Sequence, residues 1–554
     1  MALVLASALL TTMWGRHDPA AGDASGAAAE EADPPEVAIG ERLFLETRFA
    51  QFFFANAGGD ANAVLAVGDP VMDRTQTTQG SLPGSFAGTS MNCRSCHLVD
   101  EQKGVNRGGN RTYADFARRS PIPAREDGKR QTPRNSPPLV NASLPRPGFL
   151  LHFDGEFASG VDLVKGTFTG RNFGWLPTER DRAVAHIAHI IRDDDGSGDL
   201  AQAFGGAYRV VLAGTSPTIP PELRLPPAFR IDVARASDAQ ILDAVAALVD
   251  AYVASLVFAQ TDAGEFDGSP YDAFLRKNGL PRKPDPAESD LDYSRRLRRL
   301  VEGLARPQFV TRADGTLRLH SQAFVFSSRE LRGLKIFLAE PETTPPSSDA
   351  LRRGGIGNCL ACHPAPSFTD FGVHNTGAAQ AEYDGVHGLG AFMTLSVPDL
   401  ATRRRSFDAY LPPTALHPTA LRPFLETPAK GKPGRTDLGL WNVFANPDVP
   451  LPQDKIKTFL CAILPSCVPA DVLPRTIALF KTPGLRDLGH SAPFLHTGQA
   501  DTVEDVLLQY VRFSALARAG SMRNSSPPLA AMALVQNDVA ALAAFLKSLN
   551  EDYE

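Results

Sequence analysis

Two cysteine pairs, each followed directly by a histidine, constrain this chain more than any other feature. The residues are Cys93, Cys96 and His97 in the first pair and Cys359, Cys362 and His363 in the second. A C-x-x-C-H segment attaches haem covalently: each thiol forms a thioether with one vinyl group, and the adjacent imidazole becomes an iron ligand. With 6 Cys and 12 His in 554 residues, two such segments are too rare to be accidental. The sequence therefore predicts two haem c groups.

A zinc site or a redox-active dithiol is the alternative interpretation. Zinc would need ligand pairs at finger-like spacing, whereas these two motifs lie far apart in the sequence. A thioredoxin-like C-x-x-C does not require histidine at the next position. Both alternatives are weaker than haem.

Length and charge bound the remaining possibilities. A chain of 554 residues can bury more than one core, so two or three domains are expected. The net charge of −6 gives no reason to expect nucleic acid or an anionic membrane as a partner. No stretch beyond the N-terminal region reaches about 18 apolar residues, so we expect no transmembrane helix in the mature chain.

The N-terminal residues 1–35 resemble an export signal followed by a flexible leader. An apolar run at residues 3–10 precedes a polar tract rich in Ala and Gly, although a positively charged n-region is missing. A frayed terminus without function is the alternative. Because c-type haem is attached outside the cytoplasm, we expect a periplasmic protein. Cys461 and Cys467, close in sequence, are then expected to form a disulfide, with two free thiols as the alternative.

Helical patterns precede both haem motifs, at residues 40–45 and 333–338. The second begins after Ser327, whose spacing to Glu330 matches a capping box. A longer pattern from Ser237 to about Phe258 and a C-terminal one over 537–549 are also helical.

The repeated helix, loop and C-x-x-C-H order indicates an internal duplication. We therefore predict a mainly α fold with two cytochrome c-like helical domains, each carrying one haem. The predicted bounds are 36–195 for the first domain, 196–325 for a helical, loop-rich insert, and 326–554 for the second domain.

Six further segments carry motifs. They are R-N-S-P at 134–137, S-P-Y-D-A-F-L at 269–275, P-S-F-T-D at 366–370, H-N-T-G at 374–377, K-T-P-G-L-R-D at 481–487 and A-P-F-L-H-T-G at 492–498. This ordered set resembles the bacterial dihaem cytochrome c peroxidases and their relative MauG. The resemblance implies a peroxidatic N-terminal haem and an electron-transfer C-terminal haem, with His97 and His363 as proximal ligands.

The resemblance also implies further metal ligands. Tyr510 falls where the C-terminal haem takes its second axial ligand, as in MauG; an ordinary core aromatic is the alternative. A phenolate is a hard anionic ligand that favours ferric iron and lowers the reduction potential. A calcium ion between the domains would take the Asn135 side chain and the carbonyls of Ser491 and Pro493. Asn135 as a simple turn residue is the alternative there.

Two departures from the family concern the first haem. No histidine lies between His97 and His152, so the removable distal histidine of the peroxidases has no counterpart, and we expect an open, five-coordinate haem. The tryptophan between the haems is replaced by Phe153, which is much harder to oxidise; Trp175 is a candidate substitute.

A third departure concerns the distal glutamate that assists peroxide cleavage. The matching window, 170–175, contains no carboxylate and offers Asn172 and Phe173 as distal-pocket residues. The alternative acid–base groups are Glu179, Glu156 and His152.

The leading hypothesis is a periplasmic dihaem oxidoreductase that activates peroxide. Its partners would be hydrogen peroxide or dioxygen, together with a small electron-donor or acceptor protein or an organic substrate. The alternatives are a haem-dependent oxygenase acting on an organic substrate and a non-enzymatic dihaem electron carrier.

Overall fold

The structure is a computed structural model that describes residues 33–71, 76–77, 80–81, 90–97, 120–144, 146, 148–317, 320–461 and 467–551. The chain divides into two units, Met1–Pro34 and Pro35–Glu554, and everything below concerns the second. Its described part is mainly helical, with two sheets of two short strands each, which confirms the mainly α prediction. The expected export signal lies almost entirely outside the described residues.

The first hydrophobic core is built from residues between 37 and 252. Its helices are α2 (Pro35–Phe44), α3 (Gln51–Asn56), α4 (Gly160–Phe168), α5 (Arg180–Asp193), α6 (Asp199–Ala203), α7 (Tyr208–Ala213) and α8 (Asp238–Ser255). The strands β1 (Gln76–Thr77) and β2 (Gly80–Ser81) form an antiparallel pair.

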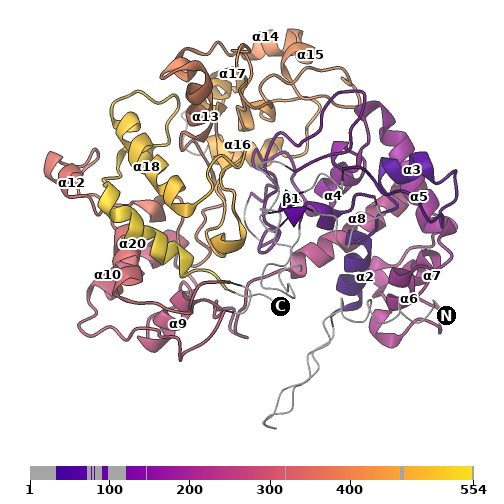
Figure 1. Cartoon of the computed structure of the whole chain (residues 1–554), viewed down its shortest axis with the longest axis horizontal. Helices are drawn as coiled ribbons and strands as arrows, with labels where there is room; N and C mark the ends of the chain where they lie inside the picture. The colour runs from indigo at the N-terminus through magenta and orange to yellow at the C-terminus, as the bar shows by residue number, and fades with distance from the viewer. Residues whose placement is uncertain are drawn as a thin grey trace. The chain divides into compact units, whose positions relative to one another are not determined.

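The second core is built from residues between 271 and 549. Its helices are α9 (Pro270–Lys277), α10 (Asp290–Glu302), α11 (Ser328–Leu338), α18 (Val503–Arg518), α19 (Pro527–Ala530) and α20 (Gln536–Lys547), with the short α12 (Ser348–Arg353) following α11 in the chain. Helices α18 and α20 pack side by side in Figure 1.

A third core, which the sequence did not indicate, is formed by Leu150 and residues 379–478. Its helices are α13 (Ala378–His387), α14 (Leu400–Arg405), α15 (Phe407–Tyr410), α16 (Gln453–Cys461) and α17 (Pro469–Val472). Trp441 and Phe444 are fully buried at its centre. The strands β3 (Val373–His374) and β4 (Phe480–Lys481) pair antiparallel, with Val373 opposite Lys481. The structure joins Cys461 and Cys467 in a disulfide, with Cα atoms 5.4 Å apart.

The two helices that precede the haem motifs pack in the same way. Helix α2 lies along α8 (Figure 1), and a Cβ at Gly40 would overlap the Leu248 carbonyl. Helix α11 lies along α20, and a Cβ at Gly333 would overlap the Ala541 carbonyl. Glycine is therefore needed at both crossings, because the helix backbones approach too closely for a side chain.

Helix α8 begins as its sequence predicts, since Ser237 and Gln240 form a reciprocal capping box. It belongs to the first core, whereas α9 and α10 belong to the second. The segment 196–325 thus contributes to both cores, and the predicted domain bounds stay predictions.

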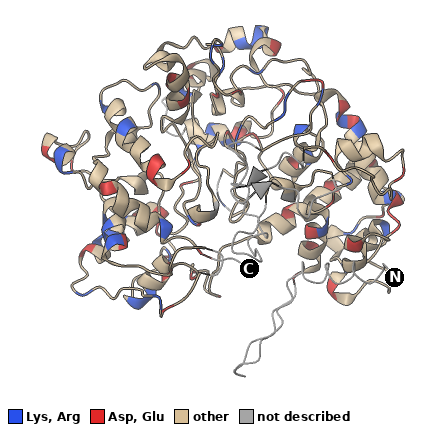
Figure 2. Cartoon of the chain, in the orientation of Figure 1, with Lys and Arg blue, Asp and Glu red and all other residues tan. Residues whose placement is uncertain are grey.

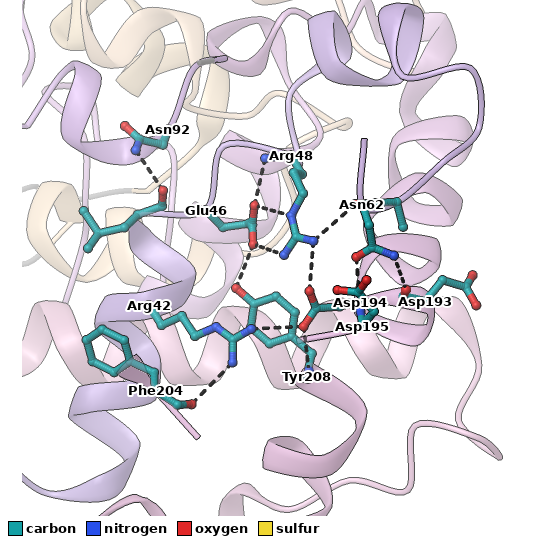
Figure 3. A network of polar contacts seen from close by, with 12 residues as sticks. Arg42, Glu46, Arg48, Asn62, Asn92, Asp193, Asp194, Asp195, Phe204 and Tyr208 are labelled. Carbon is teal, nitrogen blue, oxygen red and sulfur yellow. Dashed lines mark hydrogen bonds and ion pairs between the residues drawn. The ribbon is translucent and has the colours of Figure 1, made fainter. Parts of the chain in front are cut away.

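A buried network of charges ties α2 to α5 and α7 (Figure 3). Arg42 and Arg48 both donate to Asp194, at 3.0 and 2.9 Å, and Arg48 also pairs with Glu46 at 2.7 Å. The Tyr208 hydroxyl donates to Glu46 at 2.9 Å. Burial alone would raise the pKa of Glu46, but the charge and hydrogen bonds of Arg48 lower it to about 2.

Elsewhere, basic and acidic side chains are interspersed over the described helices (Figure 2). Among the described residues, no helix is both long enough and apolar enough to cross a bilayer.

Candidate active site

The second C-x-x-C-H segment folds into a tight turn that presents its histidine in a fixed orientation. Asn358 adopts a left-handed conformation (φ 48°), and a 3₁₀ turn follows over Cys359–Ala361. The His363 amide donates to the Cys359 carbonyl at 2.8 Å. The His363 Nδ1 lies 2.9 Å from the Phe368 carbonyl, and because a carbonyl only accepts, Nδ1 carries the proton. The Nε2 lone pair is then available for a metal, as is usual for metal-binding histidines.

This segment opens onto a cavity of about 220 Å³ that we call the C-terminal cavity. It is lined by Cys359, Cys362, His363 and Tyr510, together with mainly apolar side chains, among them Phe337, Leu485, Leu507, Met532 and Leu546. An apolar cavity with two thiols and one oriented imidazole on its wall fits a covalently attached haem.

Tyr510 reaches the C-terminal cavity from α18. Thr502 and Asp505 form the capping box that begins this helix, as its sequence indicates. Burial raises the pKa of the Tyr510 phenol, the nearby Cys362 and Cys359 raise it further, and a hydrogen bond with Thr376 opposes them. The structure thus brings Tyr510 and His363 to one cavity.

The first C-x-x-C-H segment makes the same turn. Asn92 caps it: its side-chain Oδ1 accepts from the Ser95 backbone amide at 3.0 Å, and its side-chain Nδ2 donates to the Leu45 carbonyl at 2.9 Å. Figure 3 shows Asn92 beside the charge network described above. The His97 amide donates to the Cys93 carbonyl at 2.9 Å. Leu45, the residue that follows α2, therefore holds the start of this motif in place.

His97 is half-buried, and desolvation of its ring is the main reason that its pKa falls to about 4. His152 lowers this pKa further, and a hydrogen bond with the Pro137 backbone opposes both. His152 and Pro137 line a second cavity, of about 150 Å³, which we call the N-terminal cavity. The low pKa keeps the His97 imidazole neutral, which is the form that binds iron.

The two cavities share a wall. Six residues line both of them: Pro138, Phe153, Lys481, Thr482, Pro483 and Gly484. The Lys481 amide donates to the Phe153 carbonyl at 2.7 Å, which ties the two parts of the wall together. Phe153, the residue predicted to lie between the haems, is in this shared wall.

The proposed calcium ligands lie together on the C-terminal cavity. Asn135, Ser491 and Pro493 all line it, and Asn135 Nδ2 donates to the Pro493 carbonyl at 2.6 Å. Asn135 Oδ1 is buried and has no hydrogen-bond partner among the described residues. A buried oxygen without a donor, beside a backbone carbonyl, fits a hard cation.

The predicted distal residues Asn172 and Phe173 are placed differently. Neither is among the described residues that line the two cavities. Phe173 packs against Phe168 inside the first core, with ring centroids 5.1 Å apart. Trp175 is also fully buried there and donates from Nε1 to the Phe49 carbonyl at 3.1 Å. A distal role for Asn172 and Phe173 stays a prediction.

Of the three alternative acid–base groups, one lines a cavity. His152 is on the N-terminal cavity, and its Nδ1 lies 3.2 Å from Glu156. Glu179 instead pairs with Arg125 at 2.8 Å and accepts from the Leu176 amide, so its oxygens are already engaged.

Sequence reasoning missed a group of buried ionisable residues around the shared wall. Arg134 pairs with Asp154 and with Asp437, each at 2.6 Å. The His496 ring stacks on Phe480 with centroids 4.0 Å apart, and burial lowers its pKa to about 4. Arg134 and His496 lie within recognised motifs, but nothing in the sequence indicates that Asp437 would meet them.

His374 is a second residue missed on the C-terminal cavity. Its Nε2 lies 2.7 Å from Asp370. Burial alone would lower the pKa of His374, but hydrogen bonds and charge from Asp370 and Cys362 raise it to about 10. The four-residue spacing between Asp370 and His374 was the sequence signal that could have indicated this pair.

Comparisons with known proteins complete the description. No protein-family model and no curated protein matches the chain. One similar solved structure is the diheme peroxidase BthA from Burkholderia thailandensis, with 17% sequence identity, a TM-score of 0.42, and coverage of 95% of this chain and 88% of that chain. Another is a MauG-like protein associated with microbial copper homeostasis, with 15% identity, a TM-score of 0.42, and coverage of 94% and 91%.

Proposed function

We propose that the protein is a periplasmic dihaem c-type oxidoreductase that activates peroxide. One haem would be held by Cys93, Cys96 and His97, and the other by Cys359, Cys362, His363 and Tyr510. The observation that carries the proposal is the C-terminal cavity, a mainly apolar space lined by two thiols, an oriented imidazole and a phenol. Cys93, Cys96 and His97 are not among the described residues that line either cavity, so the first haem is proposed from its attachment motif and the orientation of that turn.

Each haem, when bound, supplies one-electron chemistry that no side chain can provide. The protein orients the iron ligands and tunes the reduction potential. The Phe368 carbonyl holds the His363 ring and increases its basicity as a ligand. Tyr510 offers an anionic oxygen that favours the oxidised state. The C-terminal site would therefore store or pass electrons.

Reaction with peroxide is assigned to the His97 side, whose sequence lacks the distal histidine of related enzymes. Reducing hydrogen peroxide to two waters consumes two electrons and two protons. Proton transfer needs a positioned acid–base group, and we assign His152 to this role, with Glu156 orienting its ring. The electrons would come from a small donor protein or an organic substrate.

Calcium is a further part of the proposal. Asn135, Ser491 and Pro493 would hold the ion next to the C-terminal cavity. All three donors are neutral, so we expect weaker binding than at a carboxylate-rich site, because affinity depends on ligand charge.

The test is spectroscopic and uses the purified holoprotein. We expect two haems per chain that survive denaturation, one high-spin and one low-spin ferric signal by electron paramagnetic resonance, and a spectral change on titration with hydrogen peroxide. Two low-spin, six-coordinate signals would contradict the proposal.

Oxygen dependence separates the alternatives. A peroxide-driven enzyme turns over without dioxygen when peroxide is added, whereas an oxygenase does not. Reversible reduction of both haems without reaction towards peroxide, dioxygen or carbon monoxide would identify an electron carrier.

A further inference from the structure

Two cationic side chains meet at the shared wall. Lys481, at the end of β4, lines both cavities, and Arg146 lines the N-terminal cavity. Lys481 Nζ and Arg146 Nη2 both donate to the Leu150 carbonyl, each at 3.3 Å. The neutral Leu150 carbonyl therefore accepts hydrogen bonds from two cationic groups.

Neither cation has an acidic partner in the part of the chain that the structure describes. Among those residues, no Asp or Glu oxygen lies within 4.0 Å of Lys481 Nζ or of the Arg146 guanidinium. The other hydrogen bonds of Arg146 go to the carbonyls of Ala142 and Leu144, at 3.0 and 2.9 Å. Its Nε is buried and has no hydrogen-bond partner among those residues.

The surroundings of Arg146 are aromatic. Its guanidinium lies 4.3 Å from the Phe149 ring centroid and 4.2 Å from that of Phe371. Such rings stabilise a cation but accept none of its conventional hydrogen bonds. This arrangement holds the guanidinium in place without neutralising it.

The other charged residues on the N-terminal cavity do not neutralise the pair. Arg486 is engaged with Asp272 through two hydrogen bonds of 2.9 Å. Asp250 is the one carboxylate on the described lining, and burial raises its pKa. The pair therefore leaves an excess of positive charge at the wall.

Burying a cation without a counter-charge is costly. Burial, with a contribution from Arg146, lowers the pKa of Lys481 to about 7, and burial lowers that of Arg146 to about 10. A bound anion would offset this cost. Carboxylate fits the space between an ammonium and a guanidinium, since both donate charge-assisted hydrogen bonds to it.

We propose that Lys481 and Arg146 form a carboxylate-binding site on the wall shared by the two cavities. The carboxylate has two sources: a propionate of the haem proposed for the C-terminal cavity, or a free small carboxylate that enters the N-terminal cavity. The first source rests on the proposed function, whereas the second does not.

The test compares Lys481→Met with Lys455→Met in the holoprotein. Methionine keeps the apolar stem and removes the charge. Lys455 is a matched control because it also lies near Phe149, 5.7 Å from the ring centroid, and donates to the Ala158 carbonyl, yet it is not among the lining residues of either cavity. Lys481→Arg keeps the positive charge and is the rescue variant. Arg146→Met replaces Lys481→Met as the test variant if Lys481→Met does not fold.

The first measurement is the midpoint potential of each haem by spectroelectrochemical titration. If a propionate is the ligand, Lys481→Met makes reduction of one haem roughly tenfold less favourable, about 59 mV for a one-electron couple. The direction follows because a nearby cation stabilises the more negative reduced state. Lys481→Arg should recover most of the shift, and Lys455→Met should show none.

The second measurement is calorimetric titration with acetate at constant ionic strength, with chloride as the reference. If the site takes a free carboxylate, the wild-type protein binds acetate saturably, Lys455→Met does so equally, and Lys481→Met binds at least tenfold more weakly.

Either result supports the site and identifies its ligand. The proposal is overturned if Lys481→Met and Arg146→Met match Lys455→Met in both measurements. The haem content of the wild-type protein is determined separately. A chain without covalent haem would refute the proposed function while leaving the acetate titration valid.

Discussion

Tyr510 is the residue that the proposed function makes most important for the electronic properties of the C-terminal site. We expect Tyr510→Phe to remove an axial ligand while preserving the ring that packs against the cavity. The ferric haem at His363 should change from six- to five-coordinate, and its reduction potential should rise, because a phenolate stabilises ferric iron. Paramagnetic resonance and potentiometry measure the two effects.

Tyr383→Phe is the matched control for that change. Tyr383 is also buried, and its hydroxyl donates to the Pro433 carbonyl within the third core. Its substitution should leave both haem signals unchanged. Identical spectra for the wild type and Tyr510→Phe would show that Tyr510 is an ordinary core residue.

Asn135 allows the calcium proposal to be tested at the same scale. Chelation should lower the unfolding temperature of the wild-type protein, and added calcium should restore it, because a ligand that binds only the folded state stabilises it. At a hundredfold excess over the dissociation constant the gain is about 2.7 kcal/mol. Asn135→Ala should remove the calcium response. Calorimetry measures it, and a wild-type protein indifferent to calcium would contradict the site.

At the scale of elements, the charge network between α2, α5 and α7 stabilises the first core in a pH-dependent way. Glu46 has its pKa lowered from an ordinary 4.5 to about 2. Its contribution is therefore complete above pH 4.5 and is lost as the pH falls towards 2. We expect Glu46→Gln to cost about 3 kcal/mol at pH 7.

Urea unfolding at a series of pH values tests this expectation. The difference between the wild type and Glu46→Gln should shrink as the pH falls from 4.5 to 2. Glu222→Gln, at an exposed position, should change stability little at any pH. A pH-independent difference would mean that the Glu46 charge is not responsible.

The elements differ in how well their sequences predict them. Helices α8 and α11 begin with the side-chain caps that their sequences predict, whereas α2 begins at Pro35, before the predicted segment 40–45. The third core could not be predicted, because helices such as α14 and α15 are too short for a 3.6-residue pattern to be visible. Within it, Trp441 meets Phe424 across a loop, with ring centroids 5.0 Å apart.

The candidate site divides in a similar way. The haem segments and Tyr510 follow from local motifs and their order along the chain. The shared wall does not, because Lys481 and Phe153 come together only through long-range contacts. Lys481 lies in a recognised motif, but no local rule relates residues so distant, so its meeting with Arg146 at this wall could not be predicted.

Across the unit from Pro35 to Glu554, buried ion pairs connect segments that are distant in sequence. Arg134 is the clearest case, since it holds both Asp154 and Asp437, which are only 2% and 1% exposed. We expect Arg134→Met to destabilise the protein by about 3 to 5 kcal/mol, because it leaves two buried carboxylates without a counter-charge. Chemical denaturation measures the loss.

Arg235→Met is the control for this prediction. Its partner Asp232 is 3.5 Å away, and both side chains are largely exposed, so the change should stay within about 0.5 kcal/mol. A similarly small effect of Arg134→Met would show that water replaces the lost arginine.

The position of Phe153 in the shared wall has a consequence for how charge would cross the molecule. A phenyl ring is much harder to oxidise than an indole, so in the proposed dihaem protein an electron that crosses the shared wall would not rest on Phe153. The rate of such a transfer would depend on the thickness and packing of the wall. A wall that is hard to oxidise would also keep the oxidising power on the proposed cofactors, which would protect its side chains from damage.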